Sequence, residues 1–277
     1  MNTLKLNNFP FFSIVIPAFN AEKTIIDCLD SVEKQTFRDF EVIIINDGSS
    51  DRTGDLIAEF SLSSSLKIMT LNQNNLGVSV ARNGGMSIAK GLWIAFLDAD
   101  DEWSSNKLLR QYEIITANPE IDFLGTTRND EIHSKFYFKK FDYLNKISYK
   151  ILFYKNFFVT PTVIFKKSIL EEVGYFDPNK RYFEDCNYWI KICHQHNCFL
   201  LNESLVTTGK GKPHFGLSGL NSNIKETHKG EILNLKEALE SNLIGIVEYY
   251  FLRFYTFLKY YRRCIITIYI RTINNAE

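Results

Sequence analysis

The chain has 277 residues, enough for one large domain or two modest ones whose core needs neither disulfides nor structural metals. Its 32 Lys and Arg residues balance 32 Asp and Glu residues, which excludes a global basic field for nucleic acid and an acidic disordered tail. A hydrophobic fraction of 45% with only 14 Gly and 6 Pro excludes collagen-like, low-complexity and largely disordered chains.

The first hundred residues alternate short apolar runs, rich in β-branched side chains, with segments of helical periodicity. These predict strands at 12–20, 40–47, 66–71 and 92–100, and helices at 21–36, 53–60 and 78–89. Buried strands separated by helices are typical of an α/β fold with a doubly wound, mostly parallel sheet and helices on both faces. Ligands of such folds bind beyond the carboxyl ends of the strands.

The pattern changes after Trp103. A helix is predicted at 107–117, and 121–165 mixes short strands with aromatic segments before further helices at 170–173 and 185–194. We expect one continuous domain over residues 1–230, with a soft boundary near residue 110 where the second half begins to build the other wall of a cleft.

The segment 231–277 predicts an amphipathic helix. Apolar residues recur at spacings of three and four, namely Leu243, Val247, Tyr250, Phe254, Leu258, Tyr261 and Ile265. Arg253, Lys259, Arg262 and Arg263 fall on the opposing arc. The helix either lies in a lipid interface or packs against the domain. Because no run of 18 uncharged apolar residues exists, we do not expect the chain to span a bilayer.

The five cysteines form an odd, irregular set, which favours a reducing, cytoplasmic location. Cys193 and Cys198 enclose His194 and His196 and offer zinc-type ligands, but their spacing fits no common zinc motif. We expect this segment to end a helix and enter a strand.

Three carboxylates follow the fourth predicted strand, in the run Asp98-Ala99-Asp100-Asp101. Such a cluster is costly at a sheet edge unless a cation neutralises it. In an extended segment Asp98 and Asp100 project to the same side, where they can hold Mg²⁺ or Mn²⁺ bound to a phosphate. The alternative is a solvated acidic turn or a helix cap.

Other polar residues have both chemical and local interpretations. Asp47 either receives N–H groups of a ligand such as a nucleobase or caps the next helix. Arg82 either pairs with the acidic run or a diphosphate, or is an exposed helix residue. Asp185, beside Glu184, is either a helix cap or a general base. His214, in a loop with glycines on both sides, either closes over phosphates or is a surface histidine.

These segments in this order resemble the family 2 inverting glycosyltransferases of the GT-A fold, in the type that serves bacterial polysaccharide biosynthesis. The resemblance covers about residues 12–220 and rests on FSIVIPAFNAE, VIIINDGSSD, NNLGVSVARNGG, WIAFLDADDEW, GYFDPNKRYFEDCNYWIK and KPHFGLSG. One such motif would be weak evidence, whereas six in the right order are strong.

The resemblance implies transfer of a sugar, with inversion, from a nucleotide-sugar (a UDP-sugar is expected) to a hydroxyl of a glycan or lipid-linked acceptor. It implies a nucleotide-binding half over about 1–110, an acceptor half over about 111–230 and no nucleic-acid partner. Carried over by position, the donor would meet Pro17, Ala18, Phe19, Glu22, Asp47, Arg82, Asp98 and Ala99. Asp100, with Asp98 and His214, would bind Mn²⁺ or Mg²⁺, and Asp185 would be the catalytic base.

Two departures weaken details of the resemblance. Asn46-Asp47 replaces the usual pair of acids before Gly48, which makes the nucleotide preference less secure. Lys210 or Lys212 stands where the family has a basic residue, often arginine, before the histidine, so a diphosphate contact there would be less bidentate. Two other functions stay open at this stage: a nucleotidyltransferase on a similar sheet, and a non-catalytic membrane-associated binding protein. We expect a cytoplasmic protein that the C-terminal helix can hold at the inner face of the cell membrane.

Overall fold

A mixed sheet runs through the centre of the molecule, in a computed structural model that describes residues 9–137, 139–209 and 223–274. Among these residues the sheet has eight strands in the order β3-β2-β1-β4-β10-β6-β11-β9. The strands are β1 (Phe12–Ala18), β2 (Phe40–Asp47), β3 (Ile68–Gln73), β4 (Trp93–Phe96), β6 (Phe123–Thr127), β9 (Leu144–Lys146), β10 (Ile164–Lys166) and β11 (Cys198–Ser204).

The sheet is mostly parallel, as predicted. β1 pairs in parallel with β2 and β4, β2 with β3, and β6 with β11, whereas β10 and β9 run antiparallel to their neighbours. Two small ribbons lie beside it: β5 (Glu102–Trp103) with β12 (Val206–Thr207), and β7 (Lys135–Phe136) with β8 (Lys139–Lys140). The carboxyl ends of the parallel strands therefore meet at one edge, where the ligands of such sheets bind.

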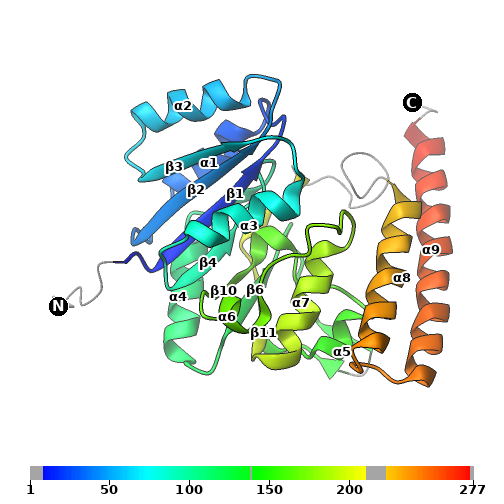
Figure 1. Ribbon diagram of the computed structural model, residues 1–277. Coiled ribbons are helices and arrows are strands. Elements are labelled where there is room, and N and C mark those ends of the chain that lie inside the picture. Colours follow the sequence, from blue (N-terminus) through cyan, green and yellow to red (C-terminus); the bar gives the residue numbers. More distant parts are fainter. Residues whose placement is uncertain (1–8, 138, 210–222, 275–277) are drawn as a thin grey trace.

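Helices cover both faces of the sheet (Figure 1). One apolar core packs Ile14 and Ile16 of β1 against α1 (Ile25–Glu33), α2 (Thr53–Ser63) and α4 (Lys107–Ala117). The other packs Val15, which points to the opposite face, against α3 (Val78–Ile88), α6 (Ile169–Val173) and α7 (Glu184–Gln195). Two short turns of helix, α5 (Tyr149–Leu152) and the 3₁₀ turn η1 (Thr160–Thr162), lie in the second half of the chain.

Some predicted boundaries are wrong. The helix predicted at 21–36 begins only at Ile25, because Thr24 and Ile25 both donate their N–H groups to the carbonyl of Ala21 in a preceding turn. The strand predicted at 92–100 is limited to Trp93–Phe96, since its pairing with β1 ends at Phe96.

The C-terminal segment forms two antiparallel helices, α8 (Ile224–Glu240) and α9 (Ile246–Asn274), rather than a single helix starting near Glu231. Figure 1 shows α8 between α7 and α9. Among the described helices, none combines the length and the hydropathy that a membrane span requires. The division at residue 110 stays a prediction; β4 and β6, on either side of it, both pair with β10 in the same sheet.

Candidate active site

Two loops at the carboxyl edge of the sheet are tied together. Asn20, after β1, adopts the left-handed region with a φ of 47°. Its Oδ1 accepts the N–H of Ser50 at 2.9 Å, and its own N–H donates to Ser49 Oγ at 3.0 Å. The residues predicted to contact the nucleoside lie at the end of β1 and in the loop after it; they are Pro17, Ala18, Phe19 and Glu22. Ala18 is buried, whereas Phe19 and Glu22 are exposed.

Asp47 ends β2 and is almost fully buried. Its Oδ1 accepts the side-chain amide of Gln73 at 2.6 Å and the N–H of Leu76 at 2.9 Å, and its Oδ2 accepts the N–H of Gly77 at 2.9 Å. The carboxylate therefore holds the loop that enters α3 and makes no cap for α2, the local alternative. Its contact with a nucleobase stays a prediction.

The acidic run after β4 is a tight turn. The N–H of Asp101 donates to the carbonyl of Asp98 at 3.0 Å, so the extended geometry predicted for Asp98 and Asp100 is wrong. The reason is that β4 has already left the ladder at Phe96. Ala99 is buried in this turn, and Asp101 Oδ1 accepts the N–H of Gly209 at 2.9 Å.

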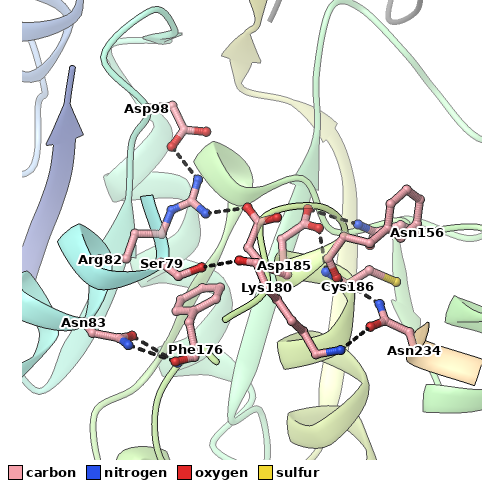
Figure 2. A network of polar contacts seen from close by, with 12 residues as sticks. Ser79, Arg82, Asn83, Asp98, Asn156, Phe176, Lys180, Asp185, Cys186 and Asn234 are labelled. Atoms are coloured by element: carbon pink, nitrogen blue, oxygen red, sulfur yellow. Dashed lines mark hydrogen bonds and ion pairs between the residues drawn. The ribbon is translucent and has the colours of Figure 1, made fainter. Parts of the chain in front are cut away.

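Arg82 joins the two halves of the site, and Figure 2 shows the arrangement. Its guanidinium, 5% exposed, donates from Nη2 to Asp98 Oδ1 at 2.8 Å and from Nη1 to Glu184 Oε1 at 3.1 Å. Burial alone lowers the pKa of Arg82, but the charges of Asp98 and Glu184 raise it above its usual value. The residue is thus a permanently charged bridge and not an exposed helix arginine.

Asp185 lies in the first turn of α7, beside that bridge (Figure 2). Its Oδ1 accepts the N–H of Cys186 at 2.6 Å and its Oδ2 accepts the side-chain amide of Asn156 at 3.3 Å. Burial raises the pKa of Asp185, while the N–H of Cys186 and the charge of Arg82 lower it. Burial and the charge of Asp185 raise the pKa of Glu184 to about 7. A buried carboxylate with a raised pKa, such as that of Asp185, suits general-base chemistry.

The acidic turn suits a divalent cation. Burial and the negative charge of Asp98 raise the pKa of Asp100, and burial with both neighbouring charges raises the pKa of Asp101 to about 8. A hard, oxygen-binding ion such as Mg²⁺ or Mn²⁺ would offset this repulsion. Within the described ranges no three His, Cys, Asp or Glu side chains converge on one point to hold a metal. The predicted third ligand, His214, lies outside the described residues, as do Lys210 and Lys212.

Three asparagines hold the site in place, and none was singled out from the sequence. Asn156 bonds Asp185, and Asn83 of α3 exchanges two hydrogen bonds with the backbone of Phe176. Asn234 of α8 donates to the carbonyl of Phe183, a residue in the left-handed region with a φ of 58°. Each of these contacts joins residues at least 29 positions apart, so no local pattern marks it.

The cysteine- and histidine-rich segment behaves as expected. Cys193 and Cys198 are buried at the end of α7 and the start of β11, and both are free thiols. His194 packs edge-on against Tyr149, with ring centroids 5.0 Å apart.

Comparisons with known proteins agree on one family. Residues 13–174, more than half of the chain, match the family described as glycosyl transferase family 2. The chain is 31% identical over 246 residues to the UDP-Glc:alpha-D-GlcNAc-diphosphoundecaprenol beta-1,3-glucosyltransferase WfgD of Escherichia coli, an alignment that covers 87% of this chain and 91% of WfgD. It is 40% identical over 116 residues to the uncharacterized glycosyltransferase EpsJ of Bacillus subtilis, which covers 42% of this chain and only 33% of EpsJ.

Solved structures share the fold. S. aureus TarS 1-349 in complex with UDP-GlcNAc superposes with a TM-score of 0.65 at 21% identity, over 87% of this chain and 70% of TarS 1-349. A mannosyltransferase from Pyrobaculum calidifontis, in complex with GDP-Man and Mn²⁺, gives a TM-score of 0.65 at 16% identity, over 84% of this chain and 65% of that protein.

Proposed function

The chain belongs to glycosyl transferase family 2 and is a glycosyltransferase of the GT-A fold. On that premise we propose that it transfers a sugar, with inversion and in a metal-dependent reaction, from a UDP-sugar. The acceptor would be a hydroxyl of a glycan or of a lipid-linked glycan. The observation that carries the proposal is the Arg82 bridge, which ties the acidic turn at Asp98 to the pair Glu184 and Asp185. On this proposal the bridge would bring the cation-binding acids and the general base to one site. We place the reaction in cell-surface polysaccharide synthesis.

The donor side would be the nucleotide-binding half, about 1–110. Pro17, Ala18, Phe19 and Glu22 would contact the nucleoside, and Asp47 would meet the base if the ligand displaces one of its three internal donors. The preference for uridine draws support from the names of WfgD and of the TarS complex, which contain UDP-Glc and UDP-GlcNAc.

Asp98 and Asp100 would hold the divalent cation, with His214 as a further ligand. When bound, Mn²⁺ or Mg²⁺ would offset the negative charge that develops on the leaving diphosphate. The name of the Pyrobaculum calidifontis complex includes Mn²⁺, which supports a cation in a protein of this fold. Arg82 would hold the Asp98 carboxylate in position, because it donates a charge-assisted hydrogen bond to it.

Asp185 would remove the proton from the acceptor hydroxyl as the oxygen attacks the anomeric carbon from the face opposite the leaving group. A single base is sufficient, since inversion forms no covalent intermediate. Asn156 and the Cys186 N–H orient the carboxylate without neutralising it. We expect Asp185→Asn to retain donor binding and to lose at least a hundredfold in transfer, within the range typical of general-base catalysis.

The test screens the purified chain for hydrolysis and transfer with nucleotide-sugars, with and without Mn²⁺. Asn187→Asp, two residues further along the same helix, is not a suitable control because the side chain of Asn187 donates to Glu237. Asp177→Asn is better, since Asp177 lies in the preceding loop and its carboxylate accepts the N–H of Asn179 in a local turn. Near wild-type turnover in Asp185→Asn would exclude this residue as the base.

The acceptor half, about 111–230, would face a membrane-bound substrate presented next to α9. The predicted apolar stripe of α9 is exposed: Val247 80%, Tyr250 62%, Phe254 62%, Leu258 50%, Tyr261 51% and Ile265 66%. The helix packs on α8 with its other face, where Lys259 and Arg263 pair with Glu231. The stripe and the flanking Arg253 and Arg262 suit an interface rich in anionic lipid, at the inner face of the cell membrane in the cytoplasm.

We expect the wild-type chain to sediment with vesicles containing phosphatidylglycerol and the Phe254→Ser, Leu258→Ser variant to sediment several-fold less. Leu62→Ser is the matched control, because Leu62 is 90% exposed on α2, away from α9. Equal sedimentation of both variants would contradict the role of α9.

A further inference from the structure

Two cations, Arg128 and Lys155, lie in the predicted acceptor half, and the function proposed above gives them no role. Arg128 directly follows β6, whose carboxyl end lies at the same edge of the sheet as the acidic turn. Its Nη1 donates to Thr208 Oγ1 at 2.6 Å, and the N–H of Thr208 donates to Asn129 Oδ1 at 2.8 Å. Gly209, the residue after Thr208, donates its N–H to the carboxylate of Asp101. The guanidinium of Arg128 is therefore held beside the acidic turn.

Arg128 also lies within electrostatic reach of the proposed base. Burial lowers the pKa of Arg128, whereas the charges of Glu131, Asp101 and Asp185 raise it. An arginine stays protonated under these conditions, so a fixed positive charge lies beside the acidic turn and within electrostatic reach of Asp185.

Lys155 contributes the second cation. It precedes Asn156, whose amide donates to Asp185 Oδ2, and its Nζ lies 4.9 Å from the ring centroid of Phe157. Burial and the positive charge of Arg128 lower the pKa of Lys155, while Glu131 raises it. Two cations close enough to repel each other beside a general base suit the binding of an anionic group, whose negative charge would reduce that repulsion.

We propose that Arg128 and Lys155 form a subsite that binds a phosphate or diphosphate group of the acceptor. In an acceptor sugar whose anomeric oxygen is phosphorylated, the phosphate lies one sugar ring away from the hydroxyl that Asp185 would deprotonate. Arg128 suits bidentate contact with phosphate oxygens, and Lys155 adds a point charge. This subsite rests on the proposed function for its biological meaning, because it selects acceptors linked to a carrier through phosphate.

Methyl diphosphate is the probe, because it has no alkyl chain that could adsorb to the exposed stripe on α9. We expect it to bind the full-length chain in EDTA, measured by calorimetry, and to bind Arg128→Gln at least tenfold more weakly. Arg128→Lys should recover part of the loss, which separates a role of the charge from misfolding. Lys166→Gln is the matched control, since Lys166 ends the antiparallel strand β10 at the opposite edge of the sheet and pairs with Asp122.

Three results would each overturn the subsite: no binding by the wild-type chain, an equal loss in Lys166→Gln, or full displacement of the probe by UDP, which would assign the cations to the donor. The binding measurement needs no transfer reaction. Failure to transfer any sugar, with binding to Arg128 intact, would instead contradict the proposed function and leave the subsite standing.

Discussion

The ion cluster between α8 and α9 gives a prediction whose size follows from the structure. Glu231 of α8 is 4% exposed and accepts Lys259 at 2.8 Å and Arg263 at 2.9 Å from α9. Although burial alone raises the pKa of Glu231, its contacts with His228 and with both cations lower it to about 2. A shift from the ordinary value of 4.5 corresponds to about 3 kcal/mol of stability at neutral pH.

Glu231→Gln keeps the shape of the side chain and removes its charge, so it should destabilise the chain by about 3 kcal/mol at pH 7 in urea unfolding. Because the folded-state pKa is lowered, this contribution is present above pH 4.5 and is lost as the pH falls toward 2. At pH 3 the difference should shrink to about 1 kcal/mol.

Glu240→Gln is the control on the same helix. Its partner Lys236 lies 3.5 Å away and both side chains are more than 60% exposed, so the change should cost under about 1 kcal/mol. Equal stability of Glu231→Gln and the wild type at pH 7, or a difference that does not change with pH, would refute the reasoning.

Two further predictions concern the packing of α3 on β1 and the proposed base. A Cβ added at Gly85 would come within 2.4 Å of Val15 Cγ1, so Gly85→Ala should destabilise the fold by about 1–3 kcal/mol in thermal melting. Gly84→Ala is the control: the nearest atom to its added Cβ is 3.8 Å away, so this change should be neutral or stabilising. The raised pKa of Asp185 places the acidic limb of the pH profile of kcat/KM above the ordinary aspartate value of 3.8. Asn156→Ala, which removes a hydrogen bond to the ionised form, should move that limb to higher pH, and an unchanged limb would argue against Asp185 as the titrating group.

Helices and strands were predictable from the sequence where the apolar pattern of a single segment fits one period. The strand at 40–47 and the helix at 107–117 begin and end at the predicted residues, because each carries an uninterrupted apolar pattern that fits one period. The strand at 92–100 was predicted too long, since its apolar letters continue past the point where its neighbours stop pairing.

The C-terminal pair shows the limit of periodicity. The spacing identifies the stripe of α9 correctly as one continuous face, but it assigns no partner to either side. Two residues of the predicted basic arc, Lys259 and Arg263, pair with the buried Glu231 of α8, which lies 28 residues before Lys259. Pairing across two helices depends on the turn at 241–245, which the periodicity of α9 does not describe.

By itself, the sequence determined the family, the alternating architecture and the acids at the strand ends, since these follow from motifs and periods that each segment contains. The tertiary structure alone decided that Arg82 bridges Asp98 and Glu184, that the acidic run is a turn, and that the charges of Asp101 and Asp185 act on Arg128. The physical reason is that a charge acts through space: its effect depends on burial and on neighbours that the fold supplies from distant parts of the chain.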